Sequence, residues 1–369
     1  MKIFERKKDG NRRSFYFCGK KFLSYKKKNY KQDVWTHFTT LNYYNTYLNG
    51  KLVKSTEKYH IKVLKYLEKY LYATKNDLDI EVSNELENPI WQIWFQGEDS
   101  MPPIVKICVQ SIKKYNPDRK IILLTKDNIK DYVSIPDYIE EKYKNGIIPH
   151  AHYADLVRFM LLYKYGGTWI DATVFMTGEM PEFISNSKLF VFKDIISTII
   201  KPATTLQQFV FLCNCREFGT WINSISFMHA QTGSKYVEHT LKCMLEYWKY
   251  EDSVYNYLFC SYLQTLIVFN DEKVKEEFIN ANSNILTVEY GMMQTGLFEH
   301  FNEEIFDNIK KMTPIHKLTY KNFDKNAYED SLLNYILKSG SDDAAETLVC
   351  VERERERERE RESNLSKCL

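Results

Sequence analysis

A chain of 369 residues that is 44% hydrophobic and 27% charged has the composition of a globular protein, with room for one large domain and additions. It contains no run of about 18 apolar residues, so no transmembrane helix is expected. Its basic start lacks the apolar stretch of a signal peptide. The eight cysteines show no CxxC spacing, which argues against a disulfide framework or a zinc site and favours a reducing, cytoplasmic compartment.

The net charge of +2 is unevenly spread along the chain. Residues 1–31 hold twelve Lys or Arg and two acidic residues, so this segment carries +10 and the rest of the chain carries −8. Aromatic residues alternate with the basic ones, and 15–17 and 22–25 are predicted as two short strands around Cys18-Gly19. A basic, aromatic hairpin favours the anionic surface of a membrane, where each Lys or Arg adds about 1 kcal/mol. A solvated, poorly ordered N-terminus is the alternative.

The next segment is predicted to be helical. Apolar residues recur at helical spacing over 53–72, which predicts an amphipathic helix packed on the outside of a larger domain. The polar, acidic stretch 76–89 is typical of a linker. The expected organisation is an N-terminal addition over 1–88, a main domain over 89–340 and a tail over 341–369.

From Pro89 onward, apolar runs alternate with helical patterns. Strands are predicted at 90–95, 120–125, 168–176 (TWIDATVFM), 188–193 and 221–230 (WINSISFMHA), and helices from Pro102, over 151–165 with a C-cap at Gly166-Gly167, and at 234–250, 254–269 and 271–280. This alternation predicts an α/β fold with a mostly parallel sheet that is covered by helices on both faces.

The tail contains ERERERERERE at 352–362. The tract has no apolar face to bury, so we expect it to be solvated and mobile. A GA dinucleotide repeat read in frame would encode it, and such repeats slip during replication. One hypothesis is therefore a genetic switch that changes the chain's ending; a charged tail with mixed codons is the alternative.

Asp155 and Arg158 are three residues apart on a predicted helix, so they share one face. By themselves they indicate a local ion pair at the edge of the core. Asp171 changes this interpretation because it interrupts an apolar strand, and a buried carboxylate needs a cation or hydrogen-bond donors. Ligands of open α/β sheets bind at the carboxyl ends of strands. A carboxylate there, close to an arginine, suits a divalent cation that holds a diphosphate.

These residues resemble those of a known family. ADLVRFMLLYKYGGTWIDAT (154–173) resembles the central motif of family 32 glycosyltransferases, especially the bacterial capsular polysaccharide synthesis proteins. That motif has a helix with Asp and Arg three apart, then Gly-Gly, then a strand with a D-x-D-type element. IWQIWFQGEDSMPPIVKICVQSI (90–112), WINSISFMHAQTG (221–233) and PIHKLTYK (314–321) are similar to flanking blocks. The resemblance covers about 88–325.

The resemblance implies a GT-A-like (Rossmann-like) fold with helical N- and C-terminal additions, a nucleotide-sugar donor and a retaining transfer. Asp155 and Arg158 would hold the sugar and its phosphate side, and Asp171 would bind Mn²⁺ or Mg²⁺. Thr173 replaces the second Asp of the motif, a form that resembles the capsular branch. The other implied site residues are Trp91, Trp94 and Gln96 at the nucleobase, His316 in the metal shell and Lys317 at the diphosphate.

Several positions keep structural alternatives. Trp91 and Trp94 could equally be core aromatics, and the His316-Lys317 pair could be a surface pair. Asn256-Tyr257 lies where the family carries an Asp-Tyr pair. His150 and His152 flank the motif helix without Cys or Glu at metal spacing, and we interpret them as loop histidines.

The predicted function is transfer of a sugar from a nucleotide donor, with a UDP-sugar expected, to a lipid-linked or growing surface polysaccharide. The protein would lie peripherally on the inner face of the plasma membrane. One alternative is a catalytically inactive partner in polysaccharide assembly, favoured by Thr173 and Asn256. Another is a nucleic-acid binder, against which the acidic body and the lack of a binding motif argue. No G-x-S-x-G, Walker or G-x-G-x-x-G motif occurs.

Overall fold

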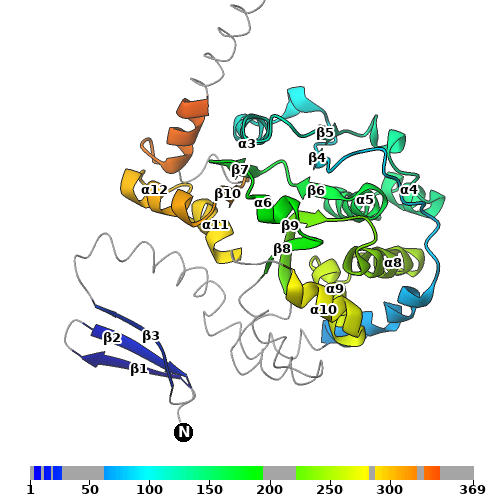
Figure 1. The fold of residues 1–369 in the computed structure, drawn as a ribbon, viewed down its shortest axis with the longest axis horizontal. Coiled ribbons are helices and arrows are strands. Elements are labelled where there is room, and N and C mark those ends of the chain that lie inside the picture. The colour runs from blue at the N-terminus through cyan, green and yellow to red at the C-terminus, as the bar shows by residue number, and fades with distance from the viewer. Residues whose placement is uncertain are drawn as a thin grey trace, which may run out of the picture.

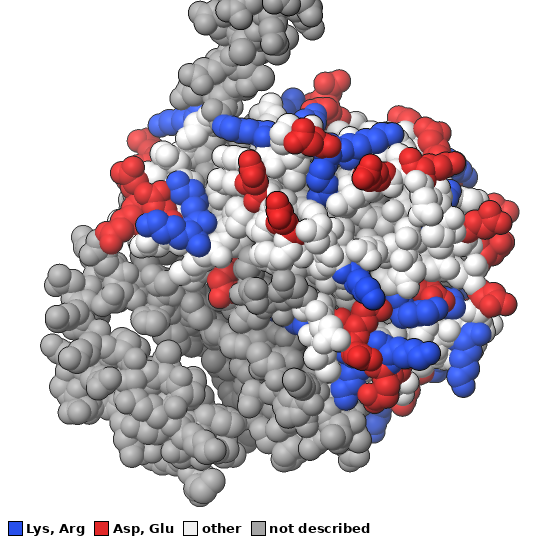
Figure 2. Space-filling view, viewed as in Figure 1, with Lys and Arg blue, Asp and Glu red and all other residues white. Residues whose placement is uncertain are grey.

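The computed structural model of the protein describes residues 4–9, 12–17, 20–26, 62–193, 222–281, 287–321 and 328–340 (Figure 1). The Glu-Arg tract over 352–362 and residues 53–61 of the predicted N-terminal helix lie outside the described residues. Within these ranges, no helix is both long and apolar enough to cross a bilayer. On the face shown in Figure 2, acidic and basic side chains are interspersed over the described surface.

A five-stranded sheet lies at the centre of the main domain, with the order β5-β4-β6-β9-β8. Its strands are β4 (Ile90–Ile93), β5 (Ile121–Leu124), β6 (Gly167–Ile170), β8 (Leu189–Lys193) and β9 (Asn223–Ala230). β4 is parallel to both β5 and β6, whereas β9 is antiparallel to its neighbours β6 and β8. Four strands therefore point in one direction, which confirms the mostly parallel sheet, and the reversed β9 between β6 and β8 was not predicted.

Helices cover both faces of this sheet, as predicted (Figure 1). On one face, α5 (His150–Tyr165) and α9 (Phe259–Asn270) contact the sheet, and α8 (Lys235–Tyr250) packs against both helices. On the other face, α11 (Thr287–Thr295) contacts β8, and α3 (Pro103–Lys114) shares a hydrophobic cluster with the strands. The pleat of a strand sends neighbouring side chains to opposite faces. In β6, Trp169 accordingly joins the core beneath α5, whereas Ile170 joins the core beneath α3 and α11.

The connection from α5 to β6 depends on the predicted Gly166-Gly167 pair. Gly166 has φ 66° and its N–H bonds to the Leu162 carbonyl at 3.1 Å, which ends the helix. Gly167 has φ 91°, and a Cβ there would lie only 2.3 Å from the Pro89 carbonyl oxygen. Only glycine therefore allows β6 to start so close to the beginning of β4.

The predicted strand over 168–176 is wrong as a single element. β6 ends at Ile170, and a hydrogen bond of 2.9 Å from the Val174 N–H to the Asp171 carbonyl closes a turn. The chain then leaves the central sheet as β7 (Val174–Met176), which pairs antiparallel with β10 (Ile315–Lys317). Asp171 therefore lies in the turn between two sheets, at the carboxyl edge of β6, rather than inside a strand.

The predicted helix over 254–269 begins five residues later, at Phe259. Asn256 explains the difference because its side chain accepts a hydrogen bond from the Leu258 N–H at 2.7 Å, and its carbonyl accepts one from the Phe259 N–H at 3.0 Å. Such side-chain bonds to the nearby backbone favour turns over helix. Tyr257 consequently lies in a loop and is 66% exposed.

The N-terminal additions are partly described. β1 (Phe4–Asp9), β2 (Arg12–Phe17) and β3 (Lys20–Lys26) form an antiparallel sheet, which confirms the two predicted strands and adds a third. Residues 62–67 are helical and continue as the 3₁₀ helix η1 (Glu68–Lys75). η1 packs against α8, where Tyr66, Lys69 and Tyr70 all donate to the Glu251 carboxylate. The predicted packing on the outside of the main domain is therefore confirmed for 62–75.

The remaining described elements complete the body around the sheet. They are η2 (Glu98–Ser100), η3 (Ile129–Asp131), α4 (Asp137–Lys144), α6 (Glu182–Ser185), α10 (Glu272–Asn280), α12 (Glu303–Met312) and a helical stretch over 332–340. α12 and the stretch 332–340 share a hydrophobic cluster with α3, so they extend the layer on the α3 face of the sheet.

Candidate active site

A cavity of about 760 Å³ opens at the carboxyl edge of β4 and β6. Its walls include residues 93–96 at the end of β4, the first half of α5, the turn 171–173 and the start of β9 at 223–226. The charged residues in the described lining are Asp155, Arg158 and Asp171. The fold thus brings together the three residues predicted to carry the chemistry, at the sheet edge where open α/β folds bind ligands.

Asp171 is the centre of the charged cluster. Its Oδ1 accepts hydrogen bonds from Arg158 Nη2 at 3.1 Å and from Trp169 Nε1 at 2.8 Å. Its Oδ2 accepts one from Lys317 Nζ at 2.7 Å. Burial alone would raise the pKa of the Asp171 carboxyl, but Lys317 and Arg158 outweigh this effect and hold the pKa below its ordinary value. The carboxylate is therefore charged at neutral pH.

Arg158 links the two carboxylates. Its Nη1 donates to Asp155 Oδ1 at 2.5 Å, and its guanidinium lies 4.7 Å from the centre of the Trp169 ring. Only 4% of Arg158 is exposed. Burial would lower the pKa of the guanidinium, but Asp155 and Asp171 together raise it. The planar fork is thus held rigidly by two partners and an aromatic face.

Lys317 reaches the cluster from β10. Its Nζ donates to Thr173 Oγ1 at 2.8 Å as well as to Asp171. The pairing of Lys317 with Val174, and the hydrogen bond from the Leu318 N–H to the Thr173 carbonyl at 2.9 Å, fix this strand beside the turn. Lys317, Thr173 and Asp171 are therefore neighbours, although 144 residues separate the lysine from the threonine.

Three predicted site residues are absent from the described lining of the cavity, and of these Lys317 contacts Asp171 whereas His316 and Trp91 point elsewhere. His316 is fully buried with its Nε2 2.9 Å from Thr177 Oγ1, and burial lowers the pKa of its imidazole to about 3. Adjacent residues of a strand point to opposite sides, so Lys317 and His316 cannot both face Asp171. Trp91 is also fully buried and donates through Nε1 to the Gly166 carbonyl at 2.9 Å, which makes it a core residue.

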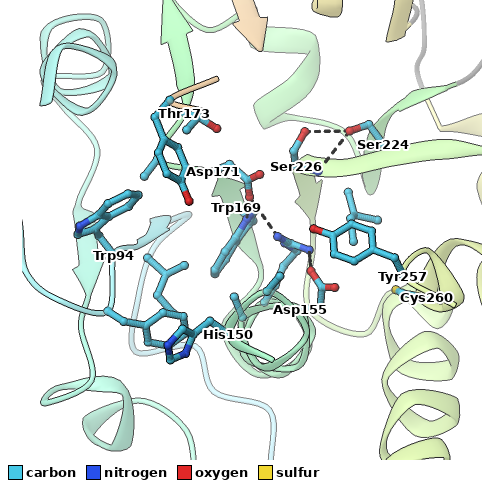
Figure 3. A pocket seen from close by; sticks show the side chains of 18 of the residues that line it. Trp94, His150, Asp155, Trp169, Asp171, Thr173, Ser224, Ser226, Tyr257 and Cys260 are labelled. Atoms are coloured by element: carbon cyan, nitrogen blue, oxygen red, sulfur yellow. Dashed lines mark hydrogen bonds and ion pairs between the residues drawn. The ribbon is translucent and has the colours of Figure 1, made fainter. Parts of the chain in front are cut away.

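Trp94 and Gln96 line the cavity. The Trp94 ring is held by a hydrogen bond of 2.9 Å from its Nε1 to Ser100 Oγ, and it meets the Tyr320 ring edge-on at a centroid distance of 5.5 Å. Figure 3 shows Trp94 on one side of Asp171 and Tyr257 on the other. Aromatic rings thus border the charged cluster on two sides.

The metal site implied by the resemblance is not matched by the ligands in the described part of the chain. No group of three or more His, Cys, Asp or Glu side chains there is placed to hold a metal ion. Asp171 and Thr173 are adjacent, but their oxygens already accept hydrogen bonds from Lys317 and Arg158. His316 faces Thr177 instead.

Comparison with known proteins identifies the family. Residues 44–336, which are 293 of the chain's 369 residues, match the family described as capsular polysaccharide synthesis protein. The chain belongs to this family. The match confirms the resemblance inferred from the central motif and extends it beyond 88–325 at both ends.

Two further proteins are similar to this member of the capsular polysaccharide synthesis family. An "O-glycosyltransferase braB" from Annulohypoxylon truncatum is 25% identical over 168 residues, which is 43% of this chain and 37% of that protein. The chain thus matches well under half the length of this relative. A solved structure, "PaToxG Glycosyltransferase", aligns over 70% of this chain and 94% of its own at 14% identity, with a TM-score of 0.33. That score is too low to support an argument from shared fold.

The structure of this family member adds site residues that the sequence interpretation missed. His150 and His152 belong to the first turn of α5, so their interpretation as loop histidines is wrong. His150 lines the cavity with its Nδ1 2.7 Å from Tyr143 Oη. His152 is buried with its Nδ1 3.5 Å from Asp155 Oδ2. The three-residue spacing from His152 to Asp155 is the signal that could have placed it.

Hydroxyl groups form a further missed part of the lining. Ser224 and Ser226 come from the same face of β9, and their Oγ atoms lie 2.8 Å apart (Figure 3). Ser226 Oγ also lies 2.8 Å from Tyr290 Oη. Their alternation in NSIS (223–226) could have indicated a polar strand face. The cavity therefore combines a charged floor, aromatic borders and a hydroxyl wall.

Proposed function

We propose that the protein is a glycosyltransferase that moves a sugar from a nucleotide-sugar donor to a hydroxyl group of a glycan or lipid-linked acceptor. The observation that carries the proposal is that Arg158 and Asp171 line the cavity and that Lys317 contacts Asp171 from behind this lining. Membership of the capsular polysaccharide synthesis family, and similarity to a protein named as an O-glycosyltransferase, support it. A surface polysaccharide is the proposed product.

The cavity suits a nucleotide diphosphate sugar in size and lining. Its volume of about 760 Å³ falls within the range of about 300–1,000 Å³ that is usual for small-molecule sites. The proposed place of the base, with uracil expected, is beside Trp94, Gln96 and Tyr320, and that of the diphosphate is near Arg158 and Lys317. Arginine and lysine are the side chains that best recognise phosphate oxygens. The sugar would then lie toward Asp155 and the hydroxyl wall of β9.

The proposed reaction breaks the bond between the anomeric carbon and the diphosphate oxygen, and the bonding electron pair stays on that oxygen. The acceptor oxygen forms the new bond to the same carbon, and its proton passes to the departing diphosphate. Arg158 and Lys317 would stabilise the charge that develops on the diphosphate. The carboxylates of Asp155 and Asp171 are both engaged with cations, which favours a retaining transfer without a separate base. The GT-A-like architecture implied by the motif belongs to this proposal.

Residues 1–31 would hold the enzyme at the inner face of the plasma membrane. Their charge of +10 favours anionic lipids, because each basic residue near such a surface contributes about 1 kcal/mol. Flotation with anionic and with neutral vesicles tests this part of the proposal. Deletion of 1–31 and high salt should both weaken binding to anionic vesicles, since salt screens the attraction. Equal binding by the full-length and the truncated protein would remove the membrane role.

A screen of nucleotide sugars tests the proposed activity. The matching donor should raise Tm by mass action and should be hydrolysed slowly when no acceptor is present. Asp171→Asn should lose the hydrolysis, whereas the control Asp118→Asn, at an exposed aspartate outside the cavity, should keep it. Donor binding without hydrolysis or transfer would instead favour a catalytically inactive partner in polysaccharide assembly.

A further inference from the structure

Lys317 occupies the position that the family resemblance gives to a metal ion. Its Nζ lies 2.7 Å from Asp171 Oδ2 and 2.8 Å from Thr173 Oγ1. These two oxygens are the ones that the D-x-T element would offer to Mn²⁺ or Mg²⁺. An ammonium group placed between them satisfies both by hydrogen bonds and neutralises the carboxylate.

The surrounding donors fit an ammonium group better than a divalent cation. Mg²⁺ requires near-ideal octahedral coordination by oxygen and is usually held by one or two carboxylates together with phosphates and waters. Among the described residues, Asp171 is the one carboxylate with a recorded contact to Lys317. Its other oxygen accepts hydrogen bonds from Arg158 and Trp169. His316 cannot complete a metal shell because its Nε2 faces Thr177.

The direction of Lys317 is fixed by the strand that carries it. β10 pairs with β7 so that His316 lies opposite Phe175 and Lys317 lies opposite Val174. Because side chains alternate along a strand, the burial of His316 directs Lys317 to the side of Asp171. Its side chain is 24% exposed, so part of it reaches solvent.

We infer that the ammonium of Lys317 is the cation of this site and that it binds the donor diphosphate without a divalent metal. This inference rests on the proposed function. An ammonium has three N–H groups, and Asp171 and Thr173 use two of them, so one is left for a phosphate oxygen. During transfer, Lys317 would donate this hydrogen bond to the diphosphate as it receives the electron pair of the broken bond, and the ammonium would keep its proton.

Manganese binding to the full-length protein, followed by electron paramagnetic resonance without nucleotide, tests the cation position directly. The wild-type protein should leave added Mn²⁺ in its free form, because the ammonium repels it from Asp171 and Thr173. A single bound Mn²⁺ that is lost in Asp171→Asn would overturn the inference. This readout needs neither a donor nor an acceptor.

Calorimetry with UDP supplies the second arm. UDP should bind in the presence of EDTA, and added Mn²⁺ should change its Kd less than twofold. Lys317→Met should weaken UDP binding by about tenfold to a hundredfold, the effect of losing one charged hydrogen bond. Lys317→Arg should retain most of the affinity, and the exposed control Lys311→Met on α12 should retain all of it.

The Mn²⁺ titration and the UDP calorimetry distinguish a failure of the inference about Lys317 from a failure of the proposed function. UDP binding that appears only with Mn²⁺, or wild-type UDP binding by Lys317→Met, would overturn the role of Lys317 and leave the proposed transferase intact. If UDP binds under neither condition, a UDP-sugar donor is contradicted, whereas the Mn²⁺ titration still decides which cation Asp171 accepts.

Discussion

An arginine lies at each end of β6, half-buried at the start of the strand and buried at its other end, and the two arginines differ in their partners. At the start of the strand, Arg119 donates to the Asn88 and Pro89 carbonyls and to Thr168 Oγ1, which are neutral acceptors. At the other end, Arg158 is paired with two carboxylates. Burial lowers the pKa of Arg119 to about 10, whereas Asp155 and Asp171 raise the pKa of Arg158 in spite of its burial.

This difference separates a structural cation from a candidate functional one. Arg119 is absent from the described lining of the cavity. It precedes β5, and its hydrogen bonds to Asn88 and Thr168 connect it to the starts of β4 and β6. Arg158 lines the cavity, and its carboxylate partners can be exchanged for the oxygens of an anionic ligand. A buried charge therefore indicates a site only when it borders a cavity and has an ionic partner that a ligand can replace.

The largest expected effect comes from Asp171→Asn at the cavity end. The amide cannot hold Arg158 and Lys317 by charge, so we expect the transfer rate to fall by about 10²–10³, which corresponds to about 3–4 kcal/mol. The Tm should change little, because the turn itself is closed by backbone hydrogen bonds. Steady-state rates and thermal unfolding check both points. A wild-type rate in this variant would contradict the role given to Asp171.

Arg119→Met should lower the stability of the protein and leave its transfer rate almost unchanged, the opposite of Asp171→Asn. The change removes the charged donor of the half-buried Asn88 carbonyl and of Thr168 Oγ1, and we expect the free energy of unfolding to fall by about 3 kcal/mol. The rate per folded molecule should stay within about twofold of the wild type. Urea unfolding and activity measurements distinguish it from Arg158→Met, for which we expect a large loss of rate. Equal rate losses in the two variants would abolish the distinction between the two ends of β6.

The start of β6 should also be sensitive to acid. His229 is buried with its Nδ1 3.0 Å from Thr168 Oγ1, and burial, together with Arg119, lowers the pKa of its imidazole to about 4. An unfolded chain takes up this proton near pH 6.5, so stability that is present at pH 7 is lost as the pH falls toward 4. Between pH 7 and pH 5, His229 should account for a loss of about 2 kcal/mol.

Urea unfolding at the two pH values checks the prediction for His229. His229→Gln removes the titrating group and should reduce the pH dependence by that amount. An unchanged pH dependence in this variant would show that His229 is protonated equally in both states. Burial lowers the imidazole pKa of His239 and His316 as well, and both are present in the wild type and the variant, so the difference between the two proteins reports His229.

The smallest expected effect concerns the Glu-Arg tract, which lies outside the described residues. Truncation after Val351 removes ERERERERERE together with SNLSKCL. Every candidate site residue precedes this point, so the rate and the Tm should both match those of the full-length chain. A loss of activity on truncation would mean that the tail takes part in substrate binding.

The sequence predicted the centre of the site better than its surroundings. Asp155, Arg158 and Asp171 could be placed because helical spacing and the carboxyl end of a strand are local features. The contact between Lys317 and Asp171 spans 146 residues and depends on a three-residue strand, whose register no local pattern specifies. For the same reason the sequence could not tell which of His316 and Lys317 contacts Asp171.

The fold shows a similar division between local and long-range information. Apolar runs located the strands, and Gly166-Gly167 located the end of α5. The split of 168–176 into β6 and β7 was missed because both halves are apolar, and only pairing with β10 reveals that the chain changes sheets. The reversed β9 was missed because direction within a sheet depends on the connections between strands rather than on the residues in them.

The close approach of Gly167 to Pro89 has a consequence for how this protein can vary. Twelve residues, 159–170, lie between Arg158 and Asp171, and they comprise the second half of α5, two glycines and one short strand. A side chain at Gly167 would collide with the backbone of Pro89, so this span cannot accommodate an insertion or a larger residue there. A change of backbone position at the glycine pair would shift β6 and would move Asp171 away from Arg158. Inherited changes in this protein should therefore accumulate in the loops around the cavity, and the span from Arg158 to Asp171 should behave as a unit of fixed length.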